Sequence, residues 1–185
     1  MINEIKQDAE KRMKKAIEML ETALARIRTG RAHPSLLDTV MIDYYGSPTQ
    51  LKQVANIGVE EGRTLTVSPW ERHLIPVIEK AIMSAGLGLN PSTSGELIRL
   101  PLPPLTEETR RNLTKVVRQE AEQGRVALRG VRRDANNDLK ELLKEKAVSE
   151  DEERKGQDDM QKMTDKYVQM VEALAEKKEK ELMEV

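Results

Sequence analysis

Arginine is concentrated in one segment of this chain, RVALRGVRRDANND at residues 125–138, which carries four arginines within nine positions. The guanidinium group is planar, and its fork of N–H donors meets phosphate oxygens two at a time and stacks on nucleobases. The wider stretch 110–133 holds eight basic and two acidic residues, a net charge of +6, in a chain whose formal net charge is -1. This local excess favours contact with the phosphates of RNA or DNA.

Helical geometry would place these arginines on one flank. At about 100° per residue, five of them fall within an arc of about 60°, over a length of roughly 32 Å. The five are Arg111, Arg118, Arg125, Arg129 and Arg132. Glu122 lies in the same arc, so the alternative is that the arginines pair with acids on their own helix or on a neighbouring one. Because aromatic residues for base stacking are scarce, we expect binding through the nucleic-acid backbone and shape, at one place on a large structured RNA.

Catalytic patterns are weak in this sequence. It has no G-x-x-x-x-G-K-[ST] phosphate loop and no H-E-x-x-H pair, and its glycines lack the spacing of a dinucleotide fingerprint. His33, Ser35 and Asp38 lie too close together in sequence to converge as a triad. Asp134 and Asn136 could ligate a metal, but a pairing of Asp134 with Arg133 is the simpler interpretation. We therefore expect no enzymatic activity, no cofactor and no metal.

Composition narrows the class of protein. The chain of 185 residues can bury a sizeable core, which must be aliphatic because there is no Phe and only one Trp. Without Cys it has no disulfide or thiolate site, which fits a reducing compartment. The N-terminus lacks the apolar segment of a signal peptide, and no stretch is long and apolar enough for a membrane span. We expect a cytoplasmic protein.

Three apolar stripes predict three long helices. They cover residues 1–29, 106–147 and 149 onward, with Thr106 as one N-cap and Ser149 with Glu152 as a capping box. The last stripe is traced through Met160, Met163, Tyr167, Met170, Leu174 and Lys178. Narrow stripes must be buried against one another, so we expect an elongated antiparallel three-helix bundle.

Residues 31–105 show a different pattern. Val40, Ile42 and Tyr44 alternate as in a strand that ends before a Gly-Ser-Pro turn at 46–48, and further strands are predicted at 49–60, 63–67 and 96–102. Residues 75–86 predict a helix with Pro76 in its first turn and Gly86 as its C-cap. Trp70 is expected in the core of this part. The predicted fold class is α+β, a bundle of residues 1–29 and 106–185 with a small β/α/β sandwich domain of residues 31–105 inserted into it.

Two linkers, 28–31 and 101–106, cross the predicted domain boundary. Gly30 tolerates unusual dihedral angles, while three prolines hold the return linker extended. The residues expected to form these linkers are Arg28, Gly30, Arg31, Pro101, Pro103 and Pro104. They are either ordinary domain linkers or a hinge that moves the small domain.

Five segments in order and spacing resemble the bacterial ribosome recycling factor family, over the whole length of the chain. They are IRTGRAHPSLLD (27–38), YYGSPTQL (44–51), LGLNPSTSG (87–95), LPLPPLTEETR (100–110) and VRRDANNDLK (131–140). The resemblance implies a long three-helix bundle with an inserted β/α/β domain on a two-stranded flexible hinge. It also implies a function: binding to the post-termination ribosome and, with elongation factor G and its GTP hydrolysis, separating the subunits and releasing mRNA and deacylated tRNA.

The resemblance also assigns roles to particular arginines. In the family the bundle lies against 23S rRNA of the large subunit through arginines of the second helix, and the matching positions are Arg110, Arg129 and Arg132, with Arg133 beside the last. Gly130 is a departure, because many members have a bulkier polar residue there and a mid-helix glycine costs about 0.5–1 kcal/mol relative to alanine.

Two other functions fit the sequence less fully. A coiled-coil scaffold would self-associate through its apolar stripes, whereas a recycling factor should sediment as a monomer. A nucleic-acid-modifying enzyme would need a catalytic cluster, for which the sequence offers no candidate.

Overall fold

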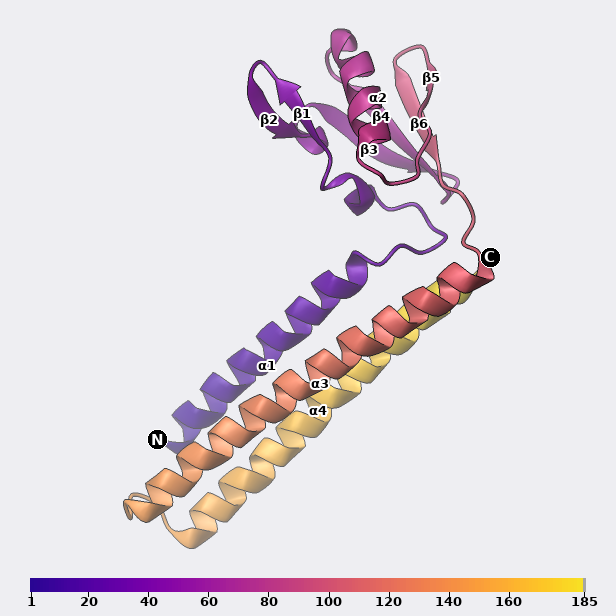
Figure 1. Ribbon diagram of the computed structural model, residues 1–185. Coiled ribbons are helices and arrows are strands. Elements are labelled where there is room, and N and C mark those ends of the chain that lie inside the picture. Colours follow the sequence, from indigo (N-terminus) through magenta and orange to yellow (C-terminus); the bar gives the residue numbers. More distant parts are fainter. Residues whose placement is uncertain (185) are drawn as a thin grey trace. The chain divides into compact units, whose positions relative to one another are not determined.

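The computed structural model describes residues 1–184 and has an α+β fold, as the sequence predicts (Figure 1). It divides into two compact units. The first combines Met1–Ile27 with Arg111–Glu181, and the second combines Arg28–Arg110 with the chain end from Leu182. No helix among residues 1–184 is both long and apolar enough to cross a membrane.

Three helices build the first unit, α1 (Ile2–Ala25), α3 (Glu107–Lys144) and α4 (Glu150–Met183). Their directions follow from pairs of contacts. Arg12 pairs with Asp134 and the Cβ position of Gly124 faces Leu20, so α1 and α3 run antiparallel. Arg118 pairs with Glu179 and Arg132 contacts Gln161, so α3 and α4 are antiparallel as well.

The predicted stripes form the core of this bundle. Five buried positions come from α1, seven from α3 and the others from α4, and Met13, Leu128, Leu139 and Met160 are fully buried. The stripe predicted on α4 is wrong at Met170, which is 39% exposed, while Val171 is fully buried. The reason is a step of four residues, not three, after Tyr167.

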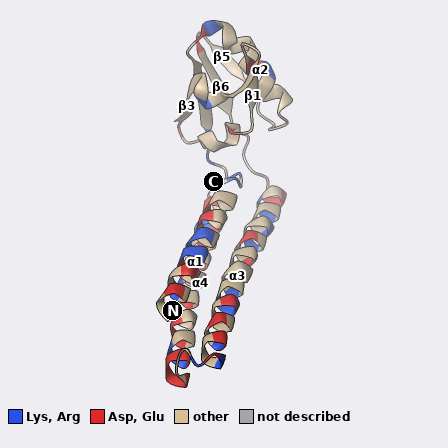
Figure 2. Cartoon of the chain, turned by 90° about the vertical axis from the view of Figure 1, so that its left-hand side faces the viewer, with Lys and Arg blue, Asp and Glu red and all other residues tan. Residues whose placement is uncertain are grey.

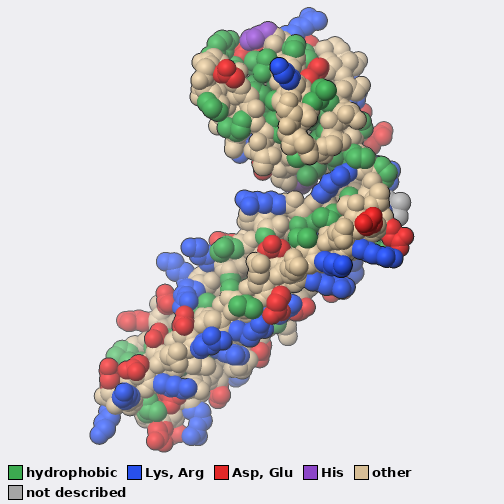
Figure 3. Space-filling view, in the orientation of Figure 1, with side chains coloured by type: hydrophobic (Ala, Val, Ile, Leu, Met, Phe, Trp, Pro, Cys, Tyr) green, Lys and Arg blue, Asp and Glu red, His purple; other side chains and the backbone are tan. Residues whose placement is uncertain are grey.

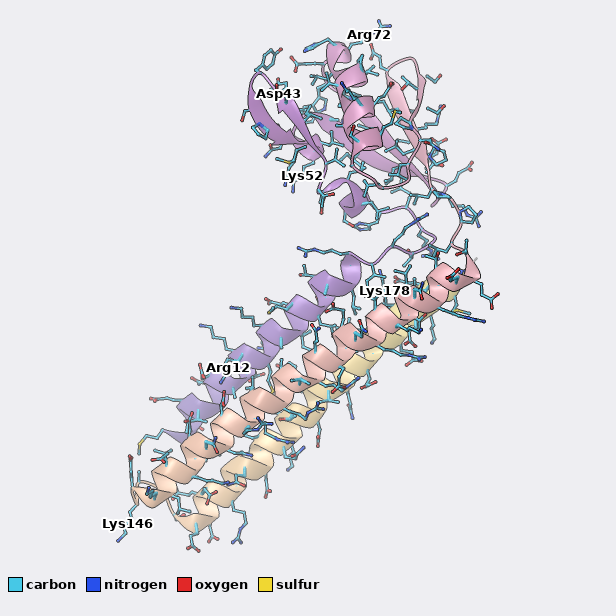
Figure 4. All side chains as sticks on the ribbon, in the orientation of Figure 1. Arg12, Asp43, Lys52, Arg72, Lys146 and Lys178 are labelled. Atoms are coloured by element: carbon cyan, nitrogen blue, oxygen red, sulfur yellow. The ribbon has the colours of Figure 1, made fainter. Side chains whose placement is uncertain are left out.

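Both predicted N-caps of the long helices are confirmed. The backbone N–H of Thr109 donates to Oγ1 of Thr106 at 3.1 Å, and that of Glu152 donates to Oγ of Ser149 at 3.1 Å. The turn between α3 and α4 includes Lys146 at a positive φ of 58°, at the end of the bundle labelled in Figure 4. The first helix ends at Ala25 and not at residue 29, and just beyond its end the N–H of Ile27 donates to the carbonyl of Leu24 at 3.1 Å.

The second unit contains two antiparallel sheets and one helix. A hairpin joins β1 (Met41–Tyr44) and β2 (Ser47–Gln50). The larger sheet has the order β3-β4-β6-β5, from β3 (Ala55–Glu60), β4 (Thr64–Pro69), β5 (Ser92–Ser94) and β6 (Leu97–Pro101). The helix α2 (Ile75–Ser84) starts with a proline in its first turn, as predicted, and shares one aliphatic core with β1, β4 and β6.

Two expectations for this unit are wrong, and one strand was missed. Residues 49–60 are not one strand, because Leu51–Gln53 form a 3₁₀ turn between β2 and β3. The short strand β5 was not predicted, because its three residues are all exposed and show no alternation. Trp70 is 61% exposed instead of buried. Along β4 the odd positions Leu65, Val67 and Pro69 point inward, so the next residue points outward.

The glycine at position 130 offers a stability test. A Cβ built at Gly130 meets nothing within 4 Å, so Gly130→Ala should raise the free energy of unfolding by about 0.5–1 kcal/mol through helix propensity. Urea unfolding followed by far-UV circular dichroism measures the change. Gly156→Ala is the control, because its Cβ would lie 3.1 Å from both Cδ atoms of Leu139 and should gain less or destabilise. Equal gains for the two variants would contradict this explanation.

Candidate nucleic-acid interface

One flank of α3 presents the arginine stripe. The core of the bundle uses the helix face around Val117, Ala121 and Leu128, and the arginines lie to one side of that face, toward α4. Figure 2 shows basic and acidic residues interspersed along the helices of the first unit. Every guanidinium keeps its charge, so the arginines differ in whether an acid lies beside them to compensate it.

Three arginines of the stripe are paired with acids. Nε of Arg118 lies 3.1 Å from Oε1 of Glu179 on α4. Arg125 contacts Glu122 at 2.9 Å and Glu172 of α4 at 2.6 Å. Arg129 contacts the other oxygen of Glu122 at 2.8 Å. The alternative raised by the sequence, pairing with acids on the same and on a neighbouring helix, thus applies to these three arginines.

The cluster around Glu122 is stable at neutral pH. Hydrogen bonds from Arg129 and then Arg125 lower the pKa of the Glu122 carboxyl, and the hydrogen bond with Glu122 raises the pKa of Arg125. A carboxyl whose pKa is lowered by folding supports the fold above its ordinary pKa, and that support is lost as the pH falls through the lowered value. Both charges of these pairs are therefore present under physiological conditions.

Arg132 and Arg133 differ from the other arginines of the stretch. Nη1 of Arg132 donates to Oε1 of Gln161 at 2.9 Å, and the amide of Gln161 in turn donates to Asp165 at 2.8 Å. Gln161 is neutral, so it fixes the position of the guanidinium without cancelling its charge. Arg133 is exposed and forms no ion pair within residues 1–184.

Asp134 does not pair with Arg133, so the interpretation drawn from the sequence is wrong on this point. Its Oδ2 accepts from Nη2 of Arg12 on α1 at 2.9 Å, on the other side of α3. Neighbouring residues of a helix point about 100° apart, so Asp134 faces α1 while Arg133 points in another direction. Among the described residues, no acid forms an ion pair with Arg132 or Arg133, so the pair keeps two positive charges.

The remaining predicted arginines lie where α3 begins. Arg111 is exposed and Arg110 is half-buried, and both make contacts within the protein. Nε of Arg110 is a buried atom without a hydrogen-bond partner. Arg110 belongs to the second compact unit, whereas Arg111 and the rest of the predicted stripe belong to the first.

The predicted hinge residues lie in the second unit. Nη2 of Arg28 donates to the carbonyl of Pro103 at 2.7 Å, and Arg31 pairs with Glu184 at 2.7 Å. Pro101 is the last residue of β6 and is paired with Thr64. Residues next to both linkers are bonded to the turn between β3 and β4. The N–H of Ala32 donates to the carbonyl of Gly62, and the N–H of Leu102 donates to that of Arg63. Gly30 has room for a Cβ, and Pro104 is exposed.

Sequence reasoning missed a groove on the opposite flank of α3. It has a volume of about 1030 Å³ and is lined by α1 and α3, with Ala16, Ala127 and Gly130 among its small residues. The sequence shows the small residues of α3 at helical spacing, but it does not show that they face α1.

The residues considered for a catalytic triad or a metal site are not grouped as such a site would require. Nδ1 of His33 lies 2.7 Å from Oγ of Ser35 and accepts from the backbone N–H of Ser35 at 3.1 Å, which caps a 3₁₀ turn at Pro34–Leu37, and Asp38 ends that turn. Asn136 lies on α3 with a buried Oδ1 that has no partner. Within residues 1–184 no three His, Asp or Glu side chains are grouped as metal ligands would be.

Comparisons with known proteins agree on one family. The profile of the family "Ribosome recycling factor" matches residues 20–183. Proteins of that description from Alcanivorax borkumensis and Legionella pneumophila (strain Corby) are 65% and 62% identical to this chain over 185 residues, which is the whole of each chain.

Two solved structures are similar over the full chain. A solution structure of the ribosome recycling factor has a TM-score of 0.77 at 41% identity and is matched over 98% of its length. The second has a TM-score of 0.68 at 43% identity and is matched over its whole length. It represents the T. thermophilus ribosome recycling factor with the E. coli elongation factor G bound to the E. coli post-termination complex.

Proposed function

This chain belongs to the ribosome recycling factor family, and from that premise we propose that it binds the post-termination ribosome and, with elongation factor G, separates the subunits. GTP hydrolysis by elongation factor G supplies the energy, and mRNA and deacylated tRNA are released. The protein acts in the cytoplasm as a translation factor without catalytic chemistry of its own. A similar structure, of a recycling factor and elongation factor G bound to a post-termination complex, supports this assignment.

The proposed anchor on 23S rRNA is the pair Arg132–Arg133. The observation that carries it is the charge: these two guanidiniums are exposed or half-buried on α3 and pair with no acid of residues 1–184, whereas Arg118, Arg125 and Arg129 are paired. A phosphate group can bind Arg132 and Arg133 without displacing a carboxylate. Arg110, Arg111, Arg118, Arg125 and Arg129 contribute more weakly, after exchanging internal partners.

The apolar stripes that suggested a self-associating scaffold pack against one another within the three-helix bundle of a single chain. Met13, Leu128 and Met160 come from three different helices and are all fully buried. That observation removes the reason to prefer a scaffold. We keep the monomer as a prediction, to be checked by sedimentation at micromolar concentration.

Light scattering tests the function directly. Post-termination ribosomes mixed with this protein, elongation factor G and GTP should show a fall in scattering as subunits separate. No fall should occur without the elongation factor or with a non-hydrolysable GTP analogue. An absence of any fall with the full mixture, while a recycling factor from another bacterium gives one, would contradict the proposal.

Removal of Glu122 should strengthen RNA binding. Glu122→Gln deletes the internal partner of Arg129 and one partner of Arg125, so the affinity for the large subunit should rise about threefold to tenfold at low salt. The control is Glu141→Gln, the same charge change at an exposed position on another flank of α3. Filter binding measures both. An equal rise in affinity for Glu141→Gln would show that the effect comes from net charge and not from freeing Arg125 and Arg129.

The linkers are proposed as a hinge. Proline fixes φ near -65° and restricts the residue before it, so Gly30→Pro should stiffen one of the two linkers. Subunit separation should slow several-fold while ribosome binding stays within about twofold, as measured by light scattering and filter binding. Unchanged separation would show that no bending is needed at this position.

A further inference from the structure

Three of the four aromatic side chains of this chain lie in the second unit, and two of them meet where β1 turns into β2. The rings of Tyr44 and Tyr45 pack edge to face with centroids 4.6 Å apart. The ring of His73 lies 6.3 Å from that of Tyr45. These rings come from two separate segments, so folding builds the cluster.

The two tyrosines have different environments. Tyr44 is partly buried and packs against the aliphatic core of the second unit. Tyr45 is 76% exposed, the largest exposed fraction among the large apolar and aromatic side chains in the part of the chain that the structure describes. Tyr44 therefore holds the cluster in place and Tyr45 presents its ring to solvent.

The backbone at the tip is unusual for tyrosine. Tyr45 has φ 50° and Gly46 has φ 85°, the combination of a tight hairpin turn in which Asn or Asp normally precedes Gly. A bulky residue at positive φ is an outlier that the surrounding structure must hold. Local turn chemistry thus gives no reason for tyrosine here, which suggests that its ring serves another purpose.

A carboxylate lies directly beside both rings. The hydroxyl of Tyr45 donates to Oε1 of Glu71 at 3.2 Å, and the hydrogen bonds to Glu71 raise the pKa of both Tyr44 and Tyr45, so both phenols remain donors at neutral pH. A carboxylate has about four acceptor positions, so Glu71 can still accept from a further donor. Figure 4 labels the nearby charges Asp43, on β1, and Arg72, near the start of α2.

We propose that Tyr44, Tyr45 and Glu71 form a docking site for an arginine side chain of a protein partner. A guanidinium stacks on an exposed aromatic ring and at the same time donates to a carboxylate, which is the pair of groups this surface offers. RNA is the poorer fit, because Glu71 would repel its phosphates. The face of the second unit in Figure 3 carries few basic side chains, unlike the first unit.

The site can be tested on the free chain, independently of ribosome recycling. The probe is the peptide acetyl-Gly-Arg-Gly-amide, and the matched probe replaces arginine with citrulline, which has the same shape without the charge. NMR resonances of the Tyr44 and Tyr45 rings report binding. We expect the dissociation constant for the arginine peptide to be about two- to fivefold lower than for the citrulline peptide, from the cation–π contribution at an exposed site.

Variants separate the ring from its hydroxyl group. Tyr45→Ala and Glu71→Gln should each weaken binding of the arginine peptide at least twofold, while Tyr45→Phe should stay within about twofold of the original because the ring face remains. Trp70→Ala, a second exposed aromatic residue of the same unit, is the control and should have no effect. Equal affinity for the two peptides would overturn the proposal. So would tighter binding of hexauridylate at the same resonances, which would make RNA the partner.

Discussion

Substituting both Arg132 and Arg133 with alanine lowers the affinity for the large ribosomal subunit by about 100-fold, if each makes a charge-assisted contact with phosphate. Such a contact contributes about 1.5 kcal/mol or more, and about 2.7 kcal/mol corresponds to a factor of 100. No internal acid is left unpaired by the change, because Arg132 contacts neutral Gln161 and Arg133 forms no ion pair within residues 1–184. The loss therefore reports the interface and not the fold. Filter binding at one fixed salt concentration measures it.

The control for this prediction is the pair Arg118→Ala and Arg125→Ala. It removes the same charge from the same helix, but the two guanidiniums are already engaged by Glu179, Glu172 and Glu122. The affinity of this variant should fall by no more than about fivefold, since the phosphates gain little from cations that have partners. The control could instead lose as much affinity as the variant with Arg132 and Arg133 changed. In that case, pairing with acids inside the protein does not decide which arginines bind rRNA.

The second large effect concerns the core of the bundle. Leu128 is fully buried on α3, so Leu128→Ala removes packed methyl groups and leaves a cavity between α1, α3 and α4. The free energy of unfolding should fall by about 2–5 kcal/mol. Val126→Ala, two residues earlier and 54% exposed, should change it by less than about 0.5 kcal/mol.

Far-UV circular dichroism is the appropriate signal for this measurement. The single Trp lies in the second unit, so its fluorescence does not report on the helices of the first. Urea titrations of the two variants beside the parent chain give the differences. A loss of less than about 1 kcal/mol for Leu128→Ala would mean that the core relaxes around the site.

Helices were the most predictable part of this protein, because their signals are local. The stripe along α3 runs through Val117, Leu128 and Leu139, and Thr106 caps the same helix. Where prediction failed, the deciding contact was distant in sequence or the segment was too short to show a pattern. The exposed tryptophan is a separate case: aromatic character suggested burial, but the alternation along β4 turns Trp70 away from the aliphatic core.

The candidate interface was predictable only in part. Charge and helical spacing identified the arginine flank, but they could not show which arginines are neutralised. Glu179 is 61 residues from Arg118 and Gln161 is 29 residues from Arg132, so the register of α4 against α3 decides this question. The tyrosine cluster was missed for the same reason, since Glu71 lies 26 residues from Tyr45.

The measurement that most directly tests the role of Arg132 and Arg133 is the salt dependence of ribosome binding. Affinity for the large subunit is measured across a range of monovalent salt for the parent chain and for the variant with both arginines changed to alanine. Each phosphate contact contributes close to one unit to the slope of log affinity against log salt concentration, so the variant should have a slope shallower by about two. An unchanged slope would show that these arginines do not bind phosphate, whatever happens to the affinity.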